Sequence, residues 1–117
     1  MRKLISLKTL LLLALVVGMV LPVVAMAKDT EIAVVVKITG IPWFNRLEEG
    51  VVEAGKDLGV NAYQVGPAEA DPAQQVKIVE DLIAKGVDAI CVVPNDAKAM
   101  EPVFEKAKSK GIVVLTH

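Results

Sequence analysis

The stretch "DPAQQVKIVEDLIAKGVDAICVV", residues 71–93, places one helix directly before one buried strand. Asp71 and Pro72 mark the helix start, because aspartate accepts hydrogen bonds from the first free amides and proline suits the first helical position. Gly86 is a typical helix stop, and residues 88–93 have the continuous apolar character of a strand covered on both faces. The apolar stripe of the helix is formed by Val76, Val79, Leu82 and Ile83.

The same unit recurs along the chain on either side of this stretch. Residues 32–37, 61–65 and 112–116 are predicted to be strands, each following or preceding a segment with helical periodicity. One helix has the inner face Phe44, Leu47, Val51, Ala54, Gly55 and Leu58 and ends at Gly59. The other begins after Asn95 or Asp96, has the inner face Met100, Val103, Phe104 and Ala107, and ends at Gly111. The order β-α-β-α-β-α-β predicts an α/β fold, a parallel sheet with helices on both faces.

The first 27 residues have the pattern of a secretory signal peptide. Basic residues begin the chain, an apolar run covers residues 10–24, and small residues at Ala25 and Ala27 fit the positions that a signal peptidase reads. A retained membrane anchor is the alternative, but the run is short for a span and contains Pro22. We therefore expect cleavage after Ala27, and a mature chain that begins at Lys28.

Charge and cysteine content exclude several classes of protein. Removing Arg2, Lys3 and Lys8 from the thirteen basic residues leaves ten against fourteen acidic residues, a formal net charge of −4. Nucleic acid is not expected as a partner, because nucleic-acid binding needs a basic face. The single Cys91 is expected to be a small buried apolar residue. With one cysteine and one histidine, the chain predicts neither a metal site nor a cofactor.

Ligands of open parallel sheets bind at the carboxyl ends of the strands, near the point where the strand order reverses. If the order is 2-1-3-4, that point lies between the first and third strands. Six side chains follow the ends of the first, third and fourth strands and are the candidate ligand-binding residues. They are Lys37, Trp43, Phe44, Asn95, Asp96 and His117.

These residue types suit a sugar-like ligand, although each has a structural alternative. The ring of Trp43 can stack on the apolar face of a sugar, while Lys37, Asn95 and Asp96 can bind its hydroxyl groups. Trp43 could equally pack within the protein, and Phe44 begins the apolar face of its helix, which favours a core position. Lys37 could be a solvated strand end, and Asp96 is better explained as a helix cap.

Three stretches resemble the periplasmic binding proteins of sugar-type ABC transporters, the class that includes ribose-binding protein. They are "GIPWFNRLEEGVVEAGKDLGVN", "DPAQQVKIVEDLIAKGVDAICVVPND" and "AMEPVFEKAKSKGIVVLTH", and the signal segment fits as well. Within the family, the lysine after "VVV" and the "PND" turn look most like the branch that binds autoinducer-2 or rhamnose-like sugars. Ribose-type members carry an asparagine where Val93 stands, and many members have an aspartate at or just after His117.

The resemblance implies a non-enzymatic, monomeric periplasmic protein that clamps a small sugar between two lobes and delivers it to a membrane ABC permease. Trp43 and Phe44 would stack on the ligand, and Lys37, Asn95 and Asp96 would be polar contacts. Family members have mature chains about two to three times longer, as two domains of ordinary size require. Residues 28–117 are then expected to be the N-terminal part of the first lobe, with the fourth strand an exposed apolar edge. Alone, this part is expected to bind sugar weakly or not at all.

Two other classes remain open at this stage. The chain could be a stand-alone interaction domain of flavodoxin-like or receiver-like type. An exported α/β enzyme ranks last, because there is no phosphate-binding loop, no nucleophile elbow and no second histidine.

Overall fold

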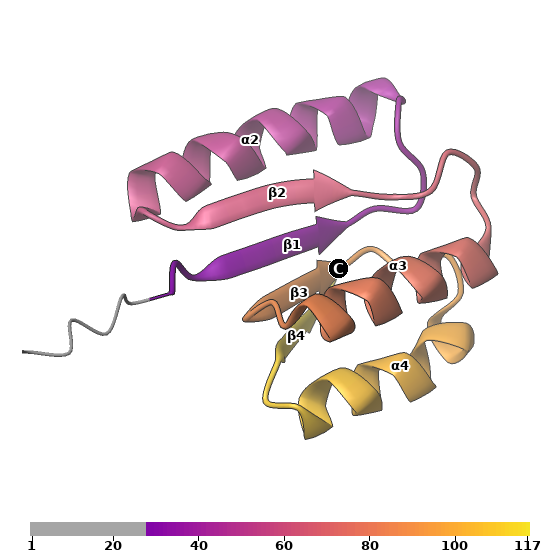
Figure 1. Ribbon diagram of the computed structural model, residues 1–117. Coiled ribbons are helices and arrows are strands. Elements are labelled where there is room, and N and C mark those ends of the chain that lie inside the picture. Colours follow the sequence, from indigo (N-terminus) through magenta and orange to yellow (C-terminus); the bar gives the residue numbers. More distant parts are fainter. Residues whose placement is uncertain (1–27) are drawn as a thin grey trace, which may run out of the picture.

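The computed structural model describes residues 28–117, and this part of the chain contains four strands and three helices in the predicted order (Figure 1). The elements are β1 (Glu31–Val35), α2 (Pro42–Leu58), β2 (Asn61–Val65), α3 (Pro72–Lys85), β3 (Ala89–Val92), α4 (Ala97–Ser109) and β4 (Val113–Thr116). The predicted signal peptide, residues 1–27, lies outside the described residues. Between residues 28 and 117 no helix is long and apolar enough to span a bilayer.

The four strands form one parallel sheet in the order β2-β1-β3-β4. Ile32 of β1 is aligned with Ala62 of β2 on one side and with Ala89 of β3 on the other. This is the order, 2-1-3-4, under which the ligand edge is expected between the first and third strands. Because all strands run the same way, their carboxyl ends share one edge, and the order reverses there between β1 and β3 (Figure 1).

The main core lies between the sheet and the helix pair α3 and α4. Side chains alternate between the faces of a strand, so Ala33 and Val35 of β1 share a face with Ile90 and Val92 of β3. All four are fully buried. The helices fill this face with Val79, Leu82, Ile83, Met100, Val103 and Ala107. The predicted stripes of both helices are therefore largely confirmed, with Phe104 half-buried against the cluster.

The opposite face is only partly covered, because α2 packs mainly over β2, which is an edge strand. Phe44 and Gly55 of this helix are buried, but three other residues predicted on its inner face are exposed: Leu47, Ala54 and Leu58, the last at 72%. Cys91 is half-buried and not buried as predicted, because it points to this face and away from the main core. Its pKa is raised by partial burial of the thiol. Val113 and Leu115 of β4 are more than half exposed, which confirms the expected apolar edge.

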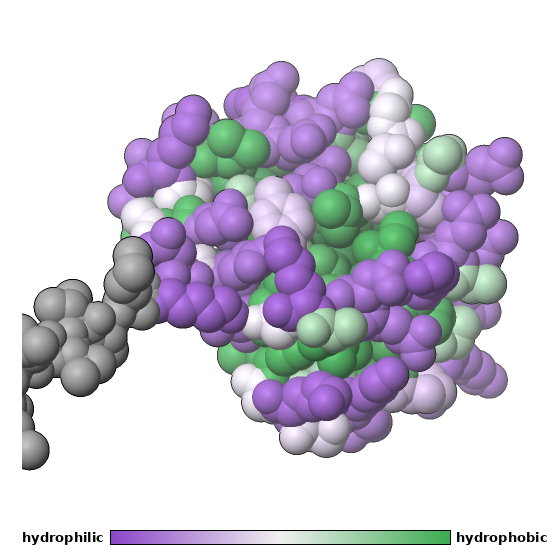
Figure 2. Space-filling model, in the orientation of Figure 1, coloured by the Kyte–Doolittle hydropathy of each residue, from purple (hydrophilic) through white to green (hydrophobic). Residues whose placement is uncertain are grey.

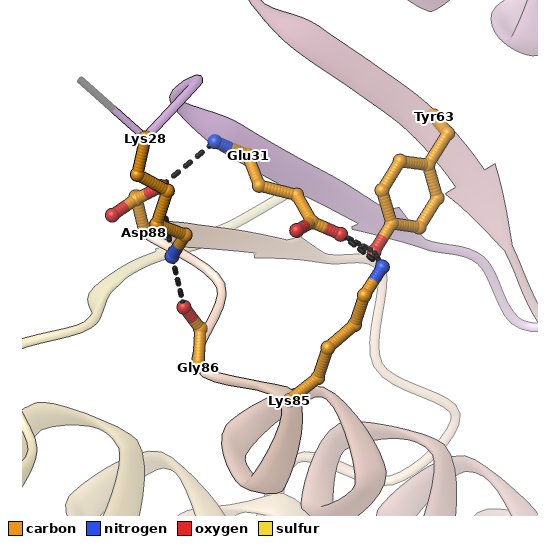
Figure 3. A network of polar contacts seen from close by, with 6 residues as sticks. All are labelled: Lys28, Glu31, Tyr63, Lys85, Gly86 and Asp88. Carbon is orange, nitrogen blue, oxygen red and sulfur yellow. Dashed lines mark hydrogen bonds and ion pairs between the residues drawn. The ribbon is translucent and has the colours of Figure 1, made fainter. Parts of the chain in front are cut away.

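A polar network holds the amino ends of the strands together, at the edge opposite the candidate ligand site (Figure 3). The Glu31 amide donates to the Asp88 carboxylate at 2.8 Å, and the Asp88 amide donates to the Glu31 carbonyl at 2.9 Å. The Glu31 carboxylate accepts from Lys85 and from the Tyr63 hydroxyl. The hydrogen bond from Lys85 and then that from Tyr63 lower the pKa of Glu31. This network joins β1, β2, α3 and the entrance to β3 through four residues.

Candidate functional site

The carboxyl edge of the sheet is where all three helices begin. Proline stands at the start of α2 and α3, and α3 is capped by Asp71, whose Oδ1 accepts from the amides of Ala73 at 2.7 Å and Gln74 at 3.1 Å. Asp96 caps α4 by accepting from the Ala99 amide at 2.9 Å. The sequence predicted both aspartate caps. The positive ends of three helix dipoles therefore face the edge where the strands end.

The loop that carries Lys37 is held against the loop after β2. The Val36 amide donates to the Val65 carbonyl at 2.9 Å, and the Thr39 amide donates to the Pro67 carbonyl at 2.9 Å. Gly66 lies so close beneath that a Cβ there would stand 2.7 Å from a methyl group of Val36 and 3.0 Å from its carbonyl oxygen. Only glycine permits this approach, so the position of the Lys37 loop depends on residue 66.

The ends of β1 and β3 are joined by Gln75, the one fully buried polar side chain among residues 28–117. Its Nε2 donates to the Val36 carbonyl at 3.1 Å and to the Val93 carbonyl at 2.9 Å. Its Oε1 accepts from the Asn95 amide at 2.8 Å. A side chain of α3 thus holds both loops that border the reversal point.

The two adjacent aromatic residues have opposite environments. Trp43 is 75% exposed at the start of α2, whereas Phe44 is 7% exposed. The backbone carbonyl of Phe44 also accepts from the Gln64 side chain at 3.0 Å. The expectation from helical periodicity, that Phe44 belongs to the core, is confirmed. Of the pair implied to stack on a ligand, the structure presents only Trp43 at the surface.

The remaining candidates lie along the same edge. Asn95 is half-buried, and its Nδ2 donates to the Lys37 carbonyl at 2.9 Å, which ties the first and third loops directly. Lys37, Asp96 and His117 are exposed. His117 extends the sheet by one hydrogen bond, from its amide to the Val92 carbonyl at 3.1 Å. The structure therefore brings the loops of Lys37 and Asn95 into contact, with Asp96 and His117 beside them.

This arrangement can bind a small polyhydroxy molecule on one side. It offers an exposed indole at the start of α2, and a cation, an amide and a carboxylate on the loops after β1 and β3. Two hollows in the surface of residues 28–117 lie elsewhere, one along the outer side of α2 and one between β2 and α3. Figure 2 shows apolar surface between the levels of β2 and α3. Val65, Ile78 and Leu82 are among the residues that line the second hollow. Neither of these two hollows includes the candidate residues.

Sequence reasoning missed Gln75. It assigned the apolar stripe of α3 to Val76, Val79, Leu82 and Ile83, but Val76 is only half-buried while Gln75 is fully buried. The signal was available in the spacing, because Gln75 stands four residues before Val79 and eight before Ile83. A polar residue in register with a buried stripe indicates a buried hydrogen-bonding role.

Comparison with known proteins agrees with this fold. The family described as periplasmic binding protein domain matches residues 32–117. The chain belongs to this family. The D-ribose/D-allose-binding protein of Pseudomonas aeruginosa is 35% identical over 102 residues, which cover 81% of this chain and 32% of that protein. The ribose import binding protein RbsB of Bacillus subtilis is 34% identical over 89 residues, covering 76% of this chain and 29% of that protein.

Solved structures of the same kind superpose on the described domain. LsrB from Clostridium saccharobutylicum in complex with AI-2 has a TM-score of 0.72 at 26% identity, over 74% of this chain and 26% of that one. An ABC transporter solute-binding protein from Clostridium phytofermentas with bound L-rhamnose has a TM-score of 0.71 at 31% identity, over 77% and 28%. The chain thus spans about a third of the length of the relatives it matches.

Proposed function

We propose that residues 28–117 are the N-terminal part of the first lobe of a sugar-binding component of an ABC-type import system, exported to the periplasm after removal of residues 1–27. The observation that carries this proposal is the carboxyl edge. There, the loops of Lys37 and Asn95 meet at the reversal of strand order, and α2, which begins at the same edge (Figure 1), presents an exposed Trp43. The family match over residues 32–117 supports it independently.

The proposed mechanism is binding without chemical change. Trp43 stacks on the apolar face of the ligand, and Lys37, Asn95, Asp96 and His117 bind its hydroxyl groups, with Phe44 supporting Trp43 from the core. A second lobe covers the opposite side of the ligand. The ligand favours the closed form because only that form contacts it from both lobes, and a membrane permease receives it from the closed protein.

The ligand class is a monosaccharide or a sugar-derived molecule such as autoinducer-2. The curated relatives favour ribose or allose, whereas the structural neighbours include proteins bound to AI-2 and L-rhamnose. In this chain, Val93 stands where ribose-type members carry an asparagine, which makes rhamnose-like ligands or autoinducer-2 the first choice.

The first test is to sequence the source DNA through and beyond codon 117. A reading frame that continues for roughly two hundred codons supports the proposal, since a second lobe of ordinary size needs that length. The encoded protein should then bind one of D-ribose, D-allose, L-rhamnose or autoinducer-2 with micromolar affinity by titration calorimetry. A stop codon after His117, together with a monomeric and cooperatively folding product, would instead favour the stand-alone interaction domain.

A further inference from the structure

The Gln75 side chain makes more hydrogen bonds at the ligand edge than the side chain of any candidate ligand-binding residue does, yet it is shielded from solvent. It is fully buried, and its partners are backbone groups on both sides of the reversal point. We propose that Gln75 is a positioning residue: its side-chain amide fixes the spacing and orientation of the loops that carry Lys37 and Asn95, without touching the ligand. This inference rests on the proposed function only in treating that edge as the ligand side.

The hydrogen-bond pattern fixes which way the amide group points. Val36 and Val93 each present a carbonyl oxygen, which can be bound only by the NH₂ group, and Asn95 presents an N–H, which can be bound only by the oxygen. Both hydrogens and the oxygen are therefore used. No isosteric side chain with a different donor pattern can satisfy all three partners.

These three partners lie at the points where the two strands become loops. Val36 directly follows β1, which ends at Val35, and Val93 directly follows β3, which ends at Val92. The Val93 amide still donates to the Val35 carbonyl at 2.9 Å, but beyond it the sheet pairing of these strands stops. The hydrogen bonds of the Gln75 side chain take the place of the next backbone hydrogen bond between β1 and β3. The strands therefore stay parallel while their loops separate toward the candidate ligand residues.

A further hydrogen bond connects the contacts of Gln75 to the exposed Lys37 loop. The Asn95 side chain donates to the Lys37 carbonyl at 2.9 Å, while the Asn95 amide is held by Gln75. The chain of contacts runs from α3 through Gln75 to Asn95 and then to the Lys37 loop. Rotation of the Gln75 side-chain amide would break its hydrogen bonds to both loops at once. A side chain that only fills volume in the core makes no such hydrogen bonds, so its rotation would not release the loops.

Hydrogen exchange of the unaltered chain tests the first step without any substitution. The side-chain amide protons of Gln75 should exchange at least a hundredfold more slowly than those of Gln74, which is exposed on the same helix. The Asn95 backbone amide should be protected to a similar degree. Equal exchange of the two glutamine side chains would overturn the proposal.

Gln75→Leu and the matched control Gln74→Leu test the positioning role. In Gln75→Leu, protection of the Asn95 amide should fall at least tenfold more than protection of Ile90 and Val79 in the core, because the loops loosen before the domain unfolds. Gln74→Leu should leave all these amides unchanged. A uniform loss at Asn95, Ile90 and Val79 would show that Gln75 is merely structural, and would refute the proposal.

Gln75→Glu should make the stability of the variant depend on pH, and this measurement remains informative if Gln75→Leu does not fold. The introduced carboxyl faces two carbonyl oxygens in a buried place, so its pKa is raised above the unfolded value near 4.3. The folded state then binds more protons between those two pKa values, and the stability of the variant relative to wild type falls as the pH rises. The gap in melting temperature should widen by roughly 5 °C or more between pH 5 and pH 7.5. A gap that does not change with pH would contradict the assigned hydrogen bonds.

The ligand-binding test uses the protein that includes the second lobe. Gln75→Leu should weaken binding of the sugar that wild type binds by at least tenfold, and Gln74→Leu by less than twofold. Unchanged affinity for Gln75→Leu would refute the positioning role. If wild type binds none of D-ribose, D-allose, L-rhamnose or autoinducer-2, the proposed function fails, while the exchange and pH results still decide what Gln75 does to the loops.

Discussion

Substitution of Trp43 and Phe44, one at a time, separates a ligand-binding aromatic from a core aromatic. Phe44 is 7% exposed and Trp43 is 75% exposed. An aromatic side chain can bury about 150–250 Å². At about 25 cal/mol per Å², the burial of Phe44 contributes about 4 kcal/mol, within the range of about 3–5 kcal/mol known for Phe→Ala in protein cores. The quarter of Trp43 that is covered contributes at most about 1.5 kcal/mol.

The two variants should therefore differ strongly in stability. For a domain of this size, about 1 kcal/mol corresponds to a shift of about 4–8 °C in melting temperature. Phe44→Ala should lower the midpoint by about 15 °C or more, or leave the domain unfolded, because the whole stability of such a domain is only about 5–13 kcal/mol. Trp43→Ala should lower it by a few degrees. Thermal and urea unfolding followed by circular dichroism measure both.

Ligand binding should show the reverse order of effects. In the protein that carries both lobes, Trp43→Ala should weaken sugar binding about tenfold or more, because the stacking surface is lost while the fold remains. Trp43→Phe keeps an aromatic face and should restore most of the affinity. Equal loss of stability in Trp43→Ala and Phe44→Ala would refute the burial argument. Unchanged affinity in a folded Trp43→Ala variant would remove Trp43 from the site.

Three further predictions concern the rest of the domain. Gly50→Ala should stabilise α2 by about 0.5–1 kcal/mol, because a Cβ at residue 50 meets no atom within 4 Å. Gly55→Ala should not stabilise it, because the added Cβ would stand 2.9 Å from the Cβ of Ala62 in β2. Urea unfolding of both variants tests this contrast, and equal stabilisation would disprove it. The lowered pKa of Glu31 means that its pairing with Lys85 stabilises the fold above the ordinary glutamate pKa, and that this contribution is lost as the pH falls through the lowered value. Glu31→Gln should therefore be less stable than wild type at pH 7 but not near pH 2, and a difference independent of pH would contradict this. Leu115→Lys, at a side chain 57% exposed on the edge strand, should reduce concentration-dependent association of residues 28–117 in sedimentation velocity with little change in melting temperature; undiminished association would place the contact elsewhere.

The sequence was sufficient for those features that depend on local patterns. Asp71 and Asp96 were recognisable as caps because aspartate before a helical stripe has one common role, and the parallel sheet followed from the buried runs and the crossover lengths. The burial of Phe44 also followed from helical spacing.

Features that depend on what lies opposite a residue were not predictable from the pattern. The spacing of Gln75 in α3 indicates that it is buried, but its partners are two carbonyl groups that follow separate strands, and nothing within α3 encodes their positions. Leu58 has the spacing of an inner-face residue but is exposed, because α2 lies over an edge strand and only part of its apolar face has a strand beneath it. Half-burial of Cys91 has the same cause. The roles of Lys37, Asn95, Asp96 and His117 toward a ligand stay predictions.

The strand order also has a consequence for the time course of folding during biosynthesis. β1 occupies an inner position, yet both of its neighbours are made after it, and the residues of β3 that pair with it are 57 positions later in the chain. At about 5–20 residues per second, roughly 3–11 s separate the synthesis of β1 from that of β3. Throughout that interval β1 exposes an apolar strand with at least one open side. A chaperone that recognises extended apolar segments would therefore find its binding site at residues 31–36, and its release would coincide with the arrival of β3.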